Sequence, residues 1–205
     1  MLRPSSTRHV YFLPGILLLV GLPLHGQNKV TTKDCSLAAE DYAVYSAVFR
    51  SREHSVDPPL ELVIVDETVT TEEVPGSDAW NFQSKSKPAP SNETIADFKS
   101  HGLKRRSLKP SLDSKITYTL APRAEIEGYF DRKVGGDGWE RFAEQHPKAP
   151  GFVDVSAVGY NRARNQALVY LGHHCGWLCG TGNLCFLAKE NGRWVIKNEY
   201  MQWIS

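Results

Sequence analysis

The chain has 205 residues, of which 24 are Lys or Arg and 23 are Asp or Glu, so its formal net charge is +1. This balance argues against a polyanion-binding protein, and we expect no nucleic acid among its partners. The length suits one ordinary domain that can fold as a monomer, without a metal ion or another cofactor.

The first 26 residues have the three parts of a secretory signal peptide. Arg3 and Arg8 lie at a basic start, residues 10–24 form an apolar run, and the small residue Gly26 marks the expected cleavage point. A retained membrane anchor is the alternative, but the run is short for a bilayer span and is interrupted by two prolines and two glycines. The sequence therefore predicts a signal peptide over 1–26 and a single secreted or periplasmic domain over 27–205, with no transmembrane segment in the mature chain. Cleavage leaves 22 basic against 23 acidic residues.

In the N-terminal half, the residue pattern predicts short helices and strands separated by loops. Asp34 can cap a helix that extends to about Arg52, because apolar residues recur three and four positions apart. The β-branched run over 60–66 predicts a buried strand, which residues 68–71 can extend. Further along we expect a loop over 75–91, a helix over 93–100, a strand over 115–120, a helix over 123–130 and a helical turn over 139–145.

Residues 101–110 are conspicuously basic. Lys104, Arg105, Arg106 and Lys109 lie close together there. A site for nucleic acid or anionic lipid normally needs a wider positive field than one loop supplies. We therefore interpret this stretch as a solvated turn.

The C-terminal third predicts an antiparallel β-meander. Candidate strands cover 153–160, 166–172, 183–189 and 193–203, and the connections between them are short. Asn191-Gly192 suits the positive φ angles of a tight hairpin turn. The expected fold class is α+β: an N-terminal helix and short helices pack on one face of a mainly antiparallel sheet that ends in this meander.

Four cysteines lie in the mature part, and disulfides persist in exported proteins. Three pairings are possible. We favour Cys175 with Cys179, because this short segment is rich in glycine, which can bend the backbone to the close Cα approach that a bridge requires. The remaining pair, Cys35 and Cys185, would then tie the start of the domain to its last sheet.

A series of motifs in the C-terminal part occurs in a fairly specific order. They are Gly138-Trp139-Glu140-Arg141-Phe142, His146-Pro147, Pro150-Gly151, Ser156-Ala157-Val158-Gly159-Tyr160-Asn161, Gln166-Ala167-Leu168-Val169-Tyr170, Cys175-Gly176, Cys179-Gly180 and Gly192-Arg193-Trp194. In this series the chain resembles a family of exported bacterial proteins with no established activity. The resemblance covers residues 136–205 well and implies bacterial export and a compact fold, without implying a catalytic role.

The sharpest chemical candidate is the run His173-His174-Cys175, with Cys179 and Cys185 further along. Imidazole and thiolate are good zinc ligands, but neighbouring residues of a strand point to opposite faces, and the Cys-x3-Cys spacing is looser than in a zinc knuckle. Oxidation of the thiols to a disulfide competes directly with metal binding. We therefore predict no metal site.

The sequence favours a disulfide-stabilised binding or structural domain whose contact surface is the loop between Gly172 and Gly182. Its candidate binding residues are His173, His174 and Trp177, because a tryptophan in a tight glycine-flanked loop has little room to become buried. The competing hypothesis is a secreted hydrolase or metal-dependent enzyme that uses His173 or His174. An enzyme predicts both histidines and a carboxylate in one concave pocket, whereas a binding domain predicts a convex bridged tip.

Overall fold

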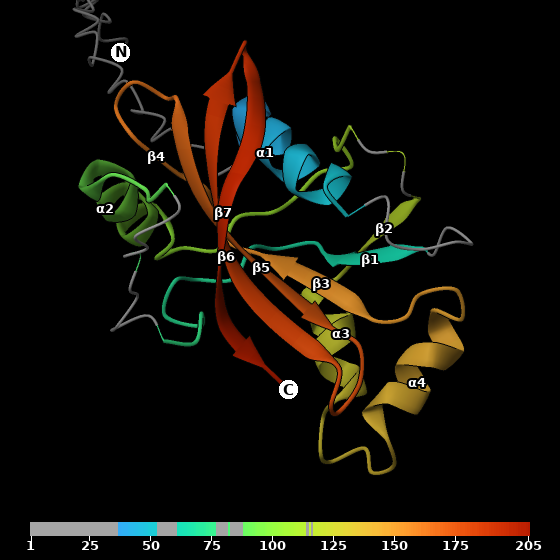
Figure 1. The fold of residues 1–205 in the computed structure, drawn as a ribbon. Helices are drawn as coiled ribbons and strands as arrows, with labels where there is room; N and C mark the ends of the chain where they lie inside the picture. Colours follow the sequence, from blue (N-terminus) through green and yellow to red (C-terminus); the bar gives the residue numbers. More distant parts are fainter. Residues whose placement is uncertain (1–36, 53–60, 77–81, 83–87, 114, 116) are drawn as a thin grey trace, which may run out of the picture. The chain divides into compact units, whose positions relative to one another are not determined.

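The computed structural model describes residues 37–52, 61–76, 82, 88–113, 115 and 117–205, which belong to one compact unit, Cys35–Ser205. The predicted α+β fold is confirmed (Figure 1). In chain order the elements are α1 Ala39–Arg50, β1 Leu62–Val65, α2 Asn92–His101, β2 Tyr118–Ala121, α3 Arg123–Tyr129, α4 Gly138–Gln145, β3 Phe152–Val155, β4 Gly159–Tyr160, β5 Gln166–His174, β6 Gly180–Glu190 and β7 Arg193–Ile204. None of the helices in these ranges is long and apolar enough to span a membrane. The predicted signal peptide and Asp34 lie outside the described residues.

The seven strands form one mixed sheet. Its order is β2-β1-β3-β5-β6-β7, and β4 pairs with β5 beside β3. Strand β1 is parallel to β2 and β3, while the remaining pairs are antiparallel. The meander β5-β6-β7 has the predicted hairpin turn, in which Asn191 and Gly192 have φ angles of 49° and 79°.

Helices cover both faces of the sheet, which corrects the expectation of helices on one face. Helix α1 packs on the face that carries Ile64, Val153 and Val169. Helices α2, α3 and α4 contribute to the clusters on the opposite face, which include Val63 and Leu168. Because consecutive strand residues alternate between faces, continuous apolar runs such as Leu62–Val65 require cover on both sides.

The start of α1 and the region after β1 differ from the prediction. Ala38 is the N-cap of α1, and the Asp41 carboxylate accepts a hydrogen bond from the Ala38 backbone N–H at 2.8 Å. An acidic side chain in the first turn thus replaces a polar cap. Residues 68–71 do not extend β1, because after β1 the chain forms only isolated bridges, of which Val69 with Ser156 is one.

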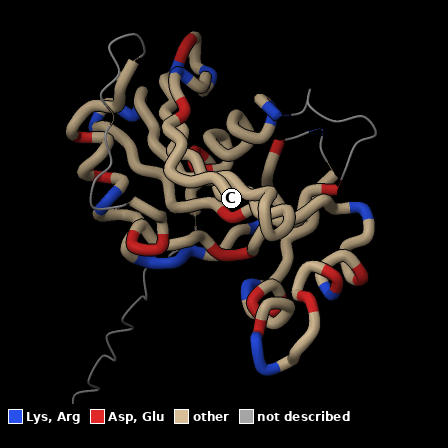
Figure 2. The backbone as a smooth tube through the Cα atoms, turned by 60° about the horizontal axis from the view of Figure 1, so that its bottom comes forward, with Lys and Arg blue, Asp and Glu red and all other residues tan. Residues whose placement is uncertain are grey.

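The charges of the described chain are mixed in sign. Figure 2 shows Lys and Arg interspersed with Asp and Glu along the backbone of the described residues. Many of them are paired, as in Lys189 with Glu40 at 2.6 Å, a contact that joins α1 to the meander. The basic stretch over 101–110 is also partly neutralised, since Arg105 forms an ion pair with Glu73.

Candidate functional site

The loop that joins β5 to β6 is closed by a disulfide. Cys175 and Cys179 form the predicted bridge, with their Cα atoms 5.1 Å apart. We call residues 175–179 the bridged loop. Its side chains Trp177 and Leu178 are 69% and 88% exposed, and the Trp177 indole N–H donates to Asp137 Oδ2 at 3.3 Å. The loop therefore presents two large apolar side chains to solvent while its backbone is tied at both ends.

Cys185 lies in β6 with a buried thiol, which forms no disulfide with any cysteine among the described residues. Burial raises the pKa of this thiol to about 12, and its Sγ lies 3.7 Å from Glu199 Oε1. Its predicted partner, Cys35, lies outside the described residues, so the Cys35–Cys185 bridge stays a prediction.

The two predicted histidines belong to strand β5 and not to the loop, because β5 extends two residues further than expected. They pair with Thr181 and Gly180 of β6 and point to opposite faces of the sheet. His173 lies on the α1 face, where burial lowers the pKa of its imidazole, and the charges of His174 and Arg52 add to this effect. The two imidazoles cannot act on one substrate from the same side.

His174 is held on the opposite face by a carboxylate and two aromatic rings. Its Nε2 lies 3.1 Å from Asp154 Oδ2 in β3. Its ring stacks on Phe152 at a centroid distance of 4.7 Å and lies 5.2 Å from the ring of Trp203. These contacts fix the orientation of the imidazole.

Two paired glycines make room for this arrangement. A Cβ at Gly172 would clash with Asp154 Oδ1 and lie within 2.8 Å of the Tyr170 hydroxyl and 3.0 Å of His174 Nε2. Its partner in β6, Gly182, has the Trp203 indole directly above it. We call the side chains over these glycines, Asp154, Tyr170, His174 and Trp203, the strand-end cluster.

The strand-end cluster has one unsatisfied acceptor. Asp154 Oδ1 is buried and has no hydrogen-bond partner in the part of the chain that the structure describes. Burial raises the pKa of Tyr170, the Asp154 charge raises it further, and the hydrogen bond from Trp203 opposes both. The cluster is therefore a neutral phenol beside a carboxylate–imidazole pair.

The strand-end cluster does not contain a nucleophile hydrogen-bonded to the His174 imidazole. Within the described ranges, no serine, threonine or cysteine is hydrogen-bonded to His174, and no group of three or more His, Cys, Asp or Glu residues could hold a metal ion. Ser156, a residue type that a hydrolase could use, is fully buried, and its hydroxyl donates to Ala157 O and accepts from Tyr170 N. Ser156 thus has a structural role.

Sequence reasoning singled out His174 and Trp177 as candidate binding residues, but it did not predict that Asp154, Tyr170 and Trp203 lie together with His174. The period of two along β5 places Tyr170, Gly172 and His174 on one face, which is a usable signal. The contribution of Asp154 requires knowing that β3 pairs with β5, which the local pattern does not reveal.

Comparisons of the chain with models of protein families, with curated proteins and with solved structures found no match. What the bridged loop and the strand-end cluster do therefore has to follow from their own geometry. That geometry brings together a rigid apolar tip and an oriented carboxylate–imidazole pair at one end of β5.

Proposed function

We propose that the chain is an exported binding domain whose contact surface is the bridged loop, and that its partner is a folded protein. The observation that carries this proposal is the exposure of Trp177 and Leu178 on a loop closed by the Cys175–Cys179 disulfide. Tryptophan is enriched among the residues that dominate binding energy at protein interfaces. A loop that is already ordered loses little conformational entropy on binding, which favours affinity.

Export is part of this proposal. The basic start, the apolar run and Gly26 support a signal peptide, and a disulfide between Cys175 and Cys179 is typical of oxidising compartments. Expression of the full chain in a bacterium that secretes it, followed by N-terminal sequencing of the exported product, should give Gln27 as the first residue. A product that retains Met1 in the cytoplasm would contradict export.

An enzyme that uses His173 or His174 has less support. Such an enzyme needs its catalytic side chains on one side of the sheet, and these two histidines lie on opposite faces. The Asp154–His174 pair can orient a base, yet Ser156, the serine considered above, is buried and engaged in two hydrogen bonds. The exposed tip accords better with a surface that docks into a partner.

Site-specific photo-crosslinking tests the contact surface. A photoreactive side chain replaces Leu178 in one sample and Leu103, which is 57% exposed elsewhere, in the control. Both are incubated with exported protein of the source bacterium. We expect a discrete adduct from position 178 only, which an excess of unmodified protein suppresses and an excess of the Trp177→Ala variant does not. Equal adducts from both positions, or equal suppression by both competitors, would overturn the proposal.

A further inference from the structure

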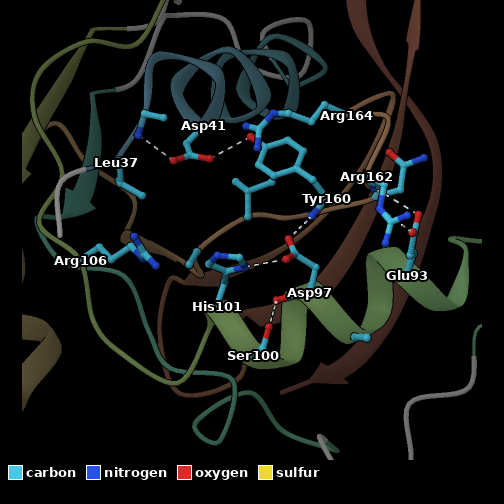
Figure 3. A pocket seen from close by; sticks show the side chains of 15 residues that line it. Leu37, Asp41, Glu93, Asp97, Ser100, His101, Arg106, Tyr160, Arg162 and Arg164 are labelled. Carbon is cyan, nitrogen blue, oxygen red and sulfur yellow. Dashed lines mark hydrogen bonds and ion pairs between the residues drawn. The ribbon is translucent and has the colours of Figure 1, made fainter. Parts of the chain in front are cut away.

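A second candidate site is a cavity at the other end of β5 from the bridged loop. It has a volume of about 810 Å³, which falls within the usual range for small-molecule sites. Its walls come from the start of α1, from α2, from β4 and from the turn after β4 (Figure 3). We call it the α1–α2 pocket. Apolar side chains, among them Leu37, Ala157 and Val158, line part of it.

The acidic side chains of this pocket already have partners. Asp41 accepts hydrogen bonds from the Tyr160 hydroxyl and the Ala38 N–H, both at 2.8 Å. Asp97 accepts one from the Tyr160 N–H at 2.7 Å and lies 2.8 Å from His101 Nδ1. Each oxygen of these two carboxylates therefore already has a partner within the protein.

The third acid is occupied as well. Glu93 accepts a hydrogen bond from the Arg162 N–H at 3.2 Å, and its other oxygen lies 3.8 Å from Arg162 Nε. The Arg162 side chain is 92% exposed. This pair thus lies at the solvent edge of the pocket.

Two guanidinium groups, by contrast, have hydrogen-bond donors to spare. Among the described residues, Arg106 Nε is buried without a hydrogen-bond partner, and no acid forms an ion pair with Arg106 or Arg164. The guanidinium of Arg164 lies 4.1 Å above the ring of Tyr160. In Figure 3 these two arginines approach the cavity from different sides. An unpaired buried donor is costly unless a bound group satisfies it.

The backbone at Arg164 provides an independent observation. Arg164 has a φ angle of 51°, in the left-handed region where glycine or asparagine is favoured over arginine. Its N–H donates to Asn161 O at 2.9 Å, which closes the turn before β5. The turn would form at lower cost with glycine, and an arginine at this position is consistent with a role for its side chain.

We infer that the α1–α2 pocket binds a small organic anion, whose carboxylate or phosphate group is held by Arg106 and Arg164 and whose apolar part contacts Leu37, Ala157 and Val158. Arginine suits this role because its planar group donates two parallel hydrogen bonds to such anions. The available donors and the engaged carboxylates favour an anion over a cation at this position. This site is separate from the bridged loop, so either proposal can fail without the other.

Binding is tested by NMR titration of the protein with three probes that share a phenyl ring. Benzoate and phenyl phosphate carry the two anionic head groups, and benzamide is the neutral control. We expect saturable shifts of the pocket amides Ser100, Val158 and Asn161 with at least one anion and none with benzamide. The anion with the lower dissociation constant shows whether the pocket prefers a carboxylate or a phosphate group. Absence of saturable shifts with both anions, or equal shifts with benzamide, would overturn the inference.

Variants of the two arginines sharpen the test. Arg164→Gly relieves the backbone strain, so we expect an unchanged or higher melting temperature together with at least a fivefold loss of affinity. Arg106→Gln should reduce affinity at least as much. The control Arg193→Gln, which changes an exposed arginine outside the pocket lining, should bind within twofold of the unmodified protein. An Arg164→Gly variant that binds as tightly as the control contradicts the inference even where Arg106→Gln fails to fold.

Discussion

Trp203 and Tyr170 are hydrogen-bonded to each other although their strands are not neighbours. The Trp203 indole N–H donates to the Tyr170 hydroxyl at 2.8 Å, across β6 at the position of Gly182. The bond is possible only because Gly182 has no side chain between them. It connects β7 directly to β5 and so fastens the edge of the meander to the centre of the sheet.

Replacing Tyr170 by Phe should therefore destabilise the domain. The indole N–H then loses its acceptor in a partly buried position, which costs about 1 to 2 kcal/mol of unfolding free energy. Urea denaturation followed by circular dichroism measures the loss. The matched control is Tyr200→Phe, which removes an exposed hydrogen bond to Pro88 O and should cost less than about 0.5 kcal/mol. Equal losses in the two variants would contradict the role of the Trp203 bond.

Two glycine-to-alanine substitutions should differ in the direction of their effect. At Gly159 in β4, a Cβ would clash with the backbone of Phe98 in α2, so we expect Gly159→Ala to cost about 1 to 3 kcal/mol or more. At Gly128 in α3 nothing lies within 4 Å of the added carbon, and alanine there should stabilise by up to about 1 kcal/mol. Melting temperatures of both variants check this. A neutral Gly159→Ala would mean that α2 moves away from the sheet freely.

Acidification should destabilise the domain through His173. Because burial lowers the pKa of His173 in the folded state, the unfolded chain binds this proton more readily once the pH falls below about 6.5. The unfolding free energy should therefore decrease from pH 7.5 to pH 5, and His173→Gln should flatten that slope. His101→Gln, at a side chain that is 52% exposed, is the control. If the pH dependence of the unfolding free energy is unchanged in His173→Gln and reduced in His101→Gln, it arises from His101 and not from His173.

The thiol of Cys185 should be inert in the folded protein. A buried thiol with a pKa of about 12 has almost no reactive thiolate at pH 8. Iodoacetamide should label the peptide that contains Cys185 only after unfolding, as mass spectrometry can show without any reductant. Labelling of the folded protein at the same rate would contradict the burial. Resistance of the unfolded, unreduced protein would instead indicate that Cys185 is bridged.

The local elements of this fold were predictable because each has a short-range cause. Alternation and β-branched residues predicted β1 and the meander, and Asn191-Gly192 predicted its last turn. The strand ends were misjudged near Gly172 and Gly182, since glycines in strands resemble loop residues until the side chains above them are known. The same glycines concealed the strand-end cluster, whose members come from β3, β5 and β7.

The α1–α2 pocket could not be predicted from the pattern for a different reason. Arg106 lies in a basic run whose other members point to solvent or pair with acids, and the sequence gives no sign that this one side chain turns inward. The pocket also joins residues that are far apart in the chain, such as Asp41 and Tyr160. Contacts between such distant residues depend on where the helices pack on the sheet, and hydrophobic periodicity does not predict that placement.

Strand β5 links the two proposed binding sites. At one end, Gln166 Oε1 accepts hydrogen bonds from Ser91 and Thr94 at the start of α2, and at the other end His174 adjoins the bridged loop. The strand is paired on both sides, with β3 and β4 on one and β6 on the other, and a shift of its register would move its buried side chains to the wrong faces. Cooperativity requires an element with two states that both ligands bias. We therefore expect the two proposed sites to bind independently, so that occupancy of one leaves the dissociation constant of the other unchanged.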